Sequence, residues 1–191
     1  ILADTTGASV SALYDDLTKA WAELGNGRMS EALERFDKLA GTPSLAAFGL
    51  YHKALAVASV GDYEGADEIL SGRASGPITV MRRGVIAHVQ ILSQLERNAD
   101  ALDVLNKAFG AEPDPTIDTL RARLEAGEPI PFDVVRNATD GLAEVMFTIA
   151  GGLNGEADDT FTLIYARAAA RLRPDNAEAV RKFLADTPVT F

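Results

Sequence analysis

The sequence contains no cysteine, few basic residues and no long apolar run, and each absence excludes a class of protein. Without cysteine there is no disulfide framework, thiolate metal site or cysteine nucleophile. Lys and Arg number 18 against 28 Asp and Glu, a net charge of −10, which argues against nucleic acid as a partner because such binding depends on clustered basic residues. The longest apolar runs, such as residues 145–150, fall far short of the roughly 20 residues that a membrane-spanning helix needs.

Histidine is also scarce, and the groups that could support catalysis form no recognisable arrangement. His52 and His88 have no second histidine three or four positions away, so the two-histidine zinc pattern is absent. The glycine-rich stretch at residues 151–156 lacks the lysine of a phosphate-binding loop and is followed by acidic residues. We therefore predict no catalytic residue, no metal site and no cofactor.

What remains is the composition of a folded helical chain. The 191 residues are 47% hydrophobic and 24% charged, which suits one domain or two small ones. Apolar residues recur at helical intervals, as at Leu13, Leu17, Ala20 and Leu24, and no stretch shows the alternation of a strand. These features predict an all-α fold.

A repeat with a period of 34 residues runs through the first part of the chain. Gly27 is followed 34 positions later by Gly61, and Ala32 is followed by Ala66 at the same distance. A third copy follows with one residue of slippage, because Ala101 lies 35 positions after Ala66. The spacing also relates Ala20 to Ala54. Small side chains allow two helices to approach to about 8–10 Å, so the repeat predicts closely packed helix pairs.

Ala54, Gly61, Asp62, Tyr63 and Ala66 together resemble the tetratricopeptide repeat, a helix-turn-helix unit of 34 residues. The resemblance implies a right-handed superhelical solenoid of antiparallel helix pairs, with about four pairs and a degenerate C-terminal part. It also implies that the first helix of each pair faces the concave side, where a peptide or a partner helix would bind.

The expected helices follow from the repeat and from the turn residues between them. Residues 1–113 should form three pairs, over about 9–40, 44–71 and 78–110. The individual helices are predicted at 9–24, 29–40, 44–59, 63–71, 78–95 and 98–110.

Residues 114–191 should continue the same solenoid as a degenerate pair over about 140–173, with helices at 140–153 and 158–173. A short helix is expected before this pair, at about 116–126, and a terminal helix should begin near Ala177. Because Val189 and Phe191 at the end of that helix have no expected cover, we expect the chain to be an internal part of a longer, bacterial-type array.

The repeat register assigns a set of aromatic, apolar and basic residues to the concave face. They predict an apolar groove with a basic patch at its Arg83 end, although the aromatic residues could equally seal neighbouring pairs. The predicted partner-binding residues are Tyr14, Leu17, Trp21, Phe48, Tyr51, His52, Leu55, Arg83, Ile86 and Gln90.

The leading hypothesis is a non-enzymatic scaffold that binds a protein or peptide on this face. The alternative is an enzyme or a small-ligand protein with a site between the third pair and the later helices, involving His88, Arg136, Asp140 or Glu144. Self-association through uncovered ends is a third hypothesis. Neither nucleic acid nor membrane insertion is expected, and a soluble chain is predicted for which cytoplasm and periplasm both remain open.

Overall fold

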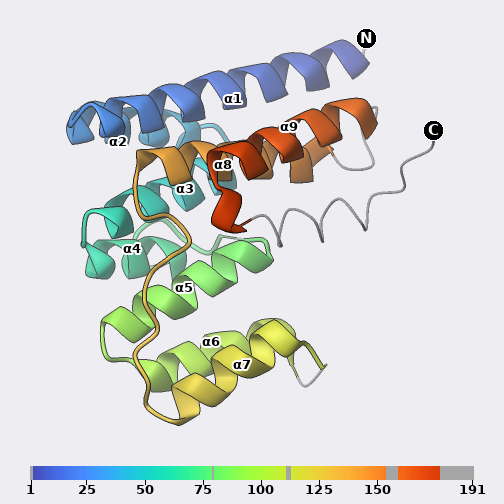
Figure 1. Ribbon diagram of the computed structural model, residues 1–191. Coiled ribbons are helices and arrows are strands. Elements are labelled where there is room, and N and C mark those ends of the chain that lie inside the picture. Colours follow the sequence, from blue (N-terminus) through green and yellow to red (C-terminus); the bar gives the residue numbers. More distant parts are fainter. Residues whose placement is uncertain (1, 79, 111–112, 154–158, 177–191) are drawn as a thin grey trace. The chain divides into compact units, whose positions relative to one another are not determined.

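The computed structural model describes residues 2–78, 80–110, 113–153 and 159–176, and every regular element within these ranges is helical (Figure 1). The predicted all-α class is therefore confirmed for this part of the chain. The elements are α1 (Leu2–Gly25), α2 (Met29–Ala40), α3 (Ala46–Ser59), α4 (Tyr63–Leu70), α5 (Arg82–Gln94), α6 (Asn98–Phe109), α7 (Pro115–Glu125), α8 (Ala138–Leu153), α9 (Asp159–Leu172) and the short 3-10 helix η1 (Pro174–Asn176).

The observed helices lie close to the expected ones, with two clear differences. The helix predicted from residue 78 begins at Arg82, because Met81 has an extended backbone (φ −70°, ψ 169°) that cannot belong to a helix. The first helix begins at Leu2 instead of residue 9. The terminal helix expected after Ala177 lies outside the described residues.

Helices α1, α3 and α5 end in the same turn. In this turn Gly27, Gly61 and Glu96 have positive φ angles of 77°, 92° and 59°. The N–H of the next residue then donates to a carbonyl five residues back: Arg28 to Glu23 (2.9 Å), Asp62 to Val57 (3.0 Å) and Arg97 to Leu92 (2.9 Å). This is the left-handed cap that closes many helices, and it satisfies carbonyl groups that the helix leaves without a partner.

A fourth copy of the turn ends α7, but no helix follows it directly. Gly127 has φ 72°, and the N–H of Glu128 donates to the carbonyl of Arg123 at 3.0 Å. Where the second helix of a pair would begin, residues Glu128–Arg136 form a non-helical connection, which we call the return segment. α7 thus ends in the same turn as α1, α3 and α5 but is followed by the return segment and not by a second helix.

The alanines of the sequence repeat are all fully buried. Each has a relative exposure of 0%: Ala20, Ala32, Ala54, Ala66 and Ala101. Val89, which stands where a small residue is expected in the third copy, is also 0% exposed. Full burial explains the preference for small side chains, because a larger group would have to be accommodated between packed helices.

By its contacts the chain divides into two compact units. Unit 1 comprises Ile1–Phe36 and Asn137–Phe191, and unit 2 comprises Asp37–Arg136. In unit 1, α1 packs against α8, which joins two distant parts of the sequence, and in unit 2, α7 packs against α6.

Unit 1 is organised around Trp21, whose side chain is fully buried. The Trp21 ring makes an edge-on contact with Phe36, with 5.8 Å between ring centroids. Gly141 of α8 lies against the same ring, and a Cβ atom at this position would overlap the indole. α8 can therefore approach α1 only because residue 141 has no side chain. On its other side α8 meets α9 through small residues: Ala150, Ala166 and Ala169.

Unit 2 contains α3 to α7, and each of these helices packs against the next one along the chain (Figure 1). One core cluster joins α5, α6 and α7 with one residue of the return segment, Ile130, which is 2% exposed. Its other members are Val89, Leu92, Ala101, Leu105, Ile117, Leu120 and Leu124. The return segment is therefore part of the packed structure of unit 2.

Glu96 occupies a position that favours glycine, because a side chain in the left-handed region costs about 1 kcal/mol. We predict that Glu96→Gly raises the free energy of unfolding by about 1 kcal/mol and that Gly61→Ala lowers it by about the same amount. Equilibrium denaturation in urea measures both.

The control is Glu68→Gly, which places glycine at an exposed position inside α4. This change should lower stability by about 1 kcal/mol, because glycine is a poor helix former. If Glu96→Gly destabilises the chain as much as Glu68→Gly does, the repeated turn is not the conformation at residue 96.

Candidate functional site

A row of polar side chains on α5 is the most distinctive feature of unit 2. Ser93 and Gln94 lie three and four residues after Gln90, so the three side chains share one side of the helix. Gln90 and Ser93 are buried at 5% and 4% exposure. Buried polar groups need hydrogen-bond partners, and here the return segment supplies them.

The return segment runs past α5 (Figure 1), and its contacts follow the opposite order along the helix, because Gln94 binds Ile130 and Gln90 binds Asp133. The Ser93 hydroxyl oxygen accepts from the N–H of Ile130 at 2.9 Å, and the Gln94 amide donates to the Ile130 carbonyl at 2.7 Å. Ser93 in turn donates to the side chain of Asn98 at 3.0 Å. Both backbone groups of Ile130 are thus bound by α5 side chains.

Gln90 makes three hydrogen bonds to the next part of the return segment. Its amide oxygen accepts from the N–H groups of Asp133 and Val134 at 3.0 and 3.3 Å, and its amide nitrogen donates to the Asp133 carboxylate at 2.6 Å. The reversed amide would direct its NH₂ group at two N–H donors and its oxygen at a carboxylate, so the network determines the orientation. A glutamine is suited to this position because one side chain supplies both an acceptor and a donor.

Prolines explain why the return segment is extended. Pro129 and Pro131 have no N–H, and each disfavours helical backbone at the residue before it. With alternate residues restricted in this way, a helix directly after Gly127 is disfavoured. Among the remaining residues, the N–H groups of Ile130, Asp133 and Val134 are all bound by side chains of α5.

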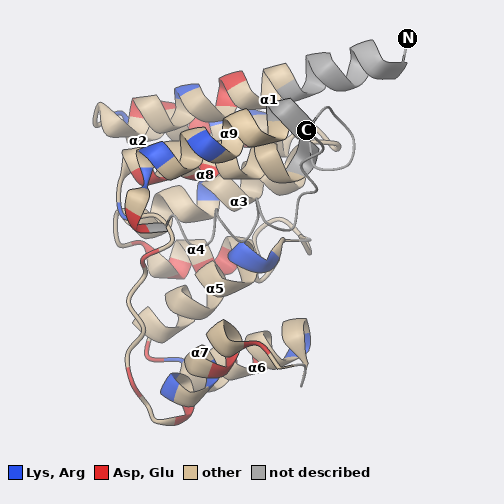
Figure 2. Ribbon diagram, turned by 45° about the vertical axis from the view of Figure 1, so that its right-hand side comes forward, with Lys and Arg blue, Asp and Glu red and all other residues tan. Residues whose placement is uncertain are grey.

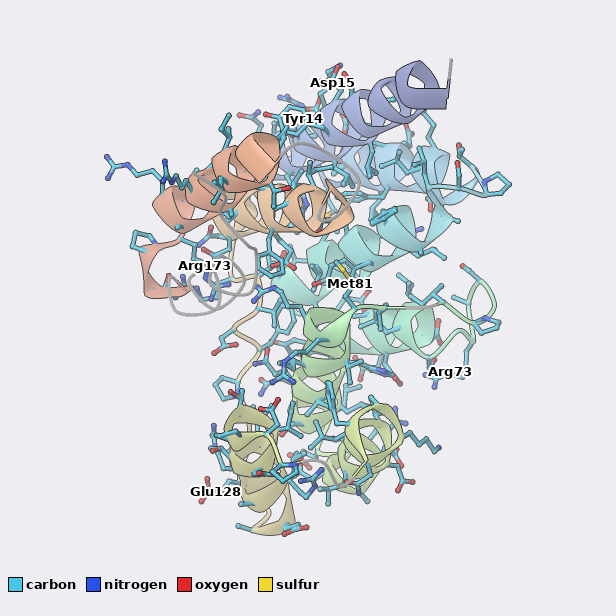
Figure 3. All side chains as sticks on the ribbon, turned by 90° about the vertical axis from the view of Figure 1, so that its right-hand side faces the viewer. Tyr14, Asp15, Arg73, Met81, Glu128 and Arg173 are labelled. Carbon is cyan, nitrogen blue, oxygen red and sulfur yellow. The ribbon has the colours of Figure 1, made fainter. Side chains whose placement is uncertain are left out.

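Contacts beyond α5 hold both ends of this arrangement. Arg123 of α7 donates to the Pro129 carbonyl at 3.0 Å and to the Glu128 carboxylate at 3.2 Å, and Figure 3 shows Glu128 beside α7. Phe132 makes an edge-on contact with Tyr63, with 6.2 Å between ring centroids. α5 and its neighbours therefore bind an extended chain mainly through its backbone, with additional contacts to Ile130, Phe132 and Asp133.

A second polar cluster in unit 2 centres on Asp67 of α4, which is 1% exposed. Its carboxylate accepts hydrogen bonds from Arg73 (2.6 Å), His88 Nε2 (2.7 Å) and Arg97 (2.6 Å). Arg73 lies on the turn after α4 (Figure 3). Because His88 belongs to α5 and Arg97 directly precedes α6, the cluster connects α4, α5 and the start of α6. Burial alone would raise the pKa of Asp67, but these three hydrogen bonds outweigh it and lower the pKa to about 2.

The outer surface of unit 2 carries basic and acidic residues side by side. On α6 and α7 the two signs lie close together (Figure 2), and Arg121 pairs with Asp118 at 2.8 Å. Arg97 pairs with the exposed Asp100 at 2.7 Å. Exposed pairs of this kind contribute little to stability, and their mixed signs provide no extended basic surface on these two helices.

Six of the ten predicted partner-binding residues are buried. Their exposures are Leu17 0%, Trp21 0%, Tyr51 5%, His52 0%, Leu55 0% and Gln90 5%. A buried side chain offers a partner almost no surface, so these six do not form the expected exposed groove. Trp21 belongs to the core of unit 1 and Gln90 binds the return segment. The partly exposed members of the set are Tyr14, Phe48, Arg83 and Ile86.

The residues of the alternative small-ligand site have varied environments. His88 is bound to Asp67, and Arg136 is exposed. In unit 1, Asp140 and Glu144 are 4% and 2% exposed, and Arg173 lies 3.8 Å from the Asp140 carboxylate. Figure 3 shows Arg173 just after α9.

Ser93, Gln94 and Asp67 are among the polar residues of these clusters that the sequence did not identify. Ser93 and Gln94 lie three and four residues after Gln90, and this polar row on one side of α5 was an available signal. Their partners lie about 40 positions away in the chain, so nothing local indicated which groups they bind.

Comparisons with protein-family models, with curated proteins and with solved structures find no match. Within the described ranges, none of the helices is both long and apolar enough to cross a membrane. A search of the same residues for three or more His, Cys, Asp or Glu side chains placed to hold a metal ion finds none.

The lowered pKa of Asp67 makes stability depend on pH. The ionised carboxylate is favoured in the folded state, so its contribution is present above the ordinary pKa of 3.8 and is lost as the pH falls through about 2. We predict that Asp67→Asn lowers the free energy of unfolding by about 2 kcal/mol at pH 7 and that its difference from the parent chain shrinks toward pH 2.

Denaturation midpoints measured from pH 7 to pH 2 test this prediction. Asp100→Asn removes an exposed partner of the same Arg97 and should change stability by less than about 0.5 kcal/mol throughout. A difference between Asp67→Asn and the parent chain that does not vary with pH would contradict the assignment.

Gln90 should control hydrogen exchange in the return segment. We predict that Gln90→Ala accelerates exchange of the Asp133 and Val134 amides about fivefold, because each amide loses a hydrogen bond worth roughly 1 kcal/mol. The Ile130 amide, bound by Ser93, should be affected much less. Nuclear magnetic resonance measures each amide separately.

Gln94→Ala is the matched control, since Gln94 binds a carbonyl of the segment and no amide. It should leave exchange at Asp133 and Val134 close to that of the parent chain. Equal acceleration by both variants would mean that Gln90 has no specific role in protecting these two amides.

Proposed function

We propose that this chain is a non-enzymatic scaffold of tetratricopeptide-like helix pairs, stacked as a solenoid, that binds a peptide or a helix of a partner protein. Three features support the proposal. The left-handed turn recurs at Gly27, Gly61 and Glu96, the repeat alanines are buried, and consecutive helices of unit 2 pack against one another. Stacked helix pairs present a continuous surface, which proteins of this kind use for binding.

The observation that carries the binding function is the extended backbone held on α5. Gln90, Ser93 and Gln94 satisfy five hydrogen-bonding groups of the return segment, four of which belong to its backbone. Backbone hydrogen bonds provide affinity without demanding one sequence, while side-chain contacts provide selectivity. The same surface chemistry suits an extended segment of another protein.

Nearer the N-terminus of α5, on the same side of the helix, Arg83 and Ile86 lie seven and four positions before Gln90. Both are partly exposed, as is Phe48 of α3. An arginine beside apolar groups is a composition that protein interfaces favour, because it combines charge-assisted hydrogen bonds with buried area. We propose that Arg83, Ile86 and Phe48 are the residues of the predicted concave face that contact the partner.

A charge reversal at Arg83 tests the proposed face. We predict that Arg83→Glu lowers the affinity for a captured partner about tenfold, because a basic contact becomes repulsive toward an acidic group. The partner is first identified by photo-crosslinking from position 86, and the affinity of the purified pair is then measured by calorimetry.

Lys107→Glu makes the same charge change at an exposed position of α6 and should leave the affinity unchanged. A crosslinker at the exposed Val60 should not capture the same partner. If Arg83→Glu and Lys107→Glu weaken binding equally, the effect is one of net charge and the proposed face is wrong. A thermal-shift screen in which a metabolite raises the unfolding temperature by several degrees would instead favour the small-ligand alternative.

A further inference from the structure

The return segment is bound to α5 in the way that a peptide ligand would be bound. Its contacts come from side chains of other elements: Gln90, Ser93 and Gln94 of α5, Asn98 of α6 and Arg123 of α7. Ile130 enters the core cluster of α5 to α7 and Val134 and Val135 are also buried, whereas Pro129, Pro131 and Asp133 are exposed. The helices thus form a surface for an extended chain that the chain itself occupies.

The contacts define which peptide this surface accepts. An aliphatic side chain at the position of Ile130 joins the core cluster of α5, α6 and α7, and its backbone binds Ser93 and Gln94. Three positions later an acidic side chain and two consecutive N–H groups bind Gln90. Proline between the two anchors lowers the entropy lost on binding, because it restricts the free peptide to extended conformations.

We infer that the α5 surface is a peptide-binding site, that its ligand is an extended segment with the pattern aliphatic, proline, aromatic, acidic, aliphatic, and that the return segment is a competing occupant built into the chain. This inference rests on the proposed function, since it names the class of peptide that the scaffold binds. A tethered segment has an effective concentration in the millimolar range or above, so a free peptide with the same contacts is excluded while the return segment is in place.

The test uses the full chain and a fluorescein-labelled synthetic peptide with the sequence of residues 127–136. In the parent chain the return segment should block the site. The double variant Phe132→Ala/Asp133→Ala weakens the return segment at two side chains that are not buried, and it should bind the peptide at least tenfold more tightly than the parent chain does. Adding Gln90→Ala to this variant should abolish the gain.

A control peptide carrying Ile130→Ser and Asp133→Lys should bind neither the parent chain nor the double variant. Equal affinity of the labelled peptide for all three chains would overturn the inference, as would absence of binding to a double variant that retains the parent circular dichroism spectrum.

If the double variant does not fold, hydrogen exchange of the parent chain decides the question. The Ile130, Asp133 and Val134 amides should then exchange through a local opening, at lower denaturant than the amides of α5 and α6. Exchange of these three only on global unfolding would mean that the return segment cannot leave the site, and the inference would be wrong. If the peptide does not bind the double variant but partner binding still depends on Arg83, the proposed function stands. Only the inference that the return segment occupies a peptide-binding site is then wrong.

Discussion

The left-handed turn that ends α1, α3, α5 and α7 is the constraint on which the rest of the structure depends. At each of these ends a residue with positive φ reverses the chain. The N–H group of the next residue then donates to the carbonyl five residues before it, which closes the last helical turn. Three times the chain then enters a second helix. After Gly127 it does not do so, because Pro129 and Pro131 disfavour helical backbone at the residues before them. The same turn therefore leads to a helix pair or to an extended segment, depending on which residues follow it.

An extended segment against helices has no neighbouring strand to satisfy its backbone, so side chains must do this. Gln90, Ser93 and Gln94 provide the donors and acceptors, and Ile130 fixes the segment in the core cluster of α5 to α7. Polar residues on a buried helix side are costly unless paired, and here the pairing is what determines the position of the segment. The α5 surface thus binds an extended backbone, which is why we propose that a partner binds there.

The all-α class and most helix positions could be predicted from sequence because they depend on local signals. Apolar periodicity and glycine turns identified α2, for example, with its observed bounds at residues 29–40. Longer-range features were missed for a physical reason. The repeat register assigned Leu17 and Trp21 to a concave binding face, but α1 packs against α8, more than a hundred positions away, and both side chains are fully buried. Similarly, Gln90 was assigned to a binding face, whereas its observed partners, Asp133 and Val134, depend on where the return segment lies.

The most direct test of this account is a solution nuclear magnetic resonance measurement on the uniformly labelled chain. It would combine backbone chemical shifts for residues 128–136 with contacts between the Gln90 side-chain amide and the backbone amides of Asp133 and Val134. The account predicts extended shifts throughout the return segment and a measurable nuclear Overhauser effect between these amides. Helical shifts at 128–136, or a Gln90 amide without these contacts, would contradict it.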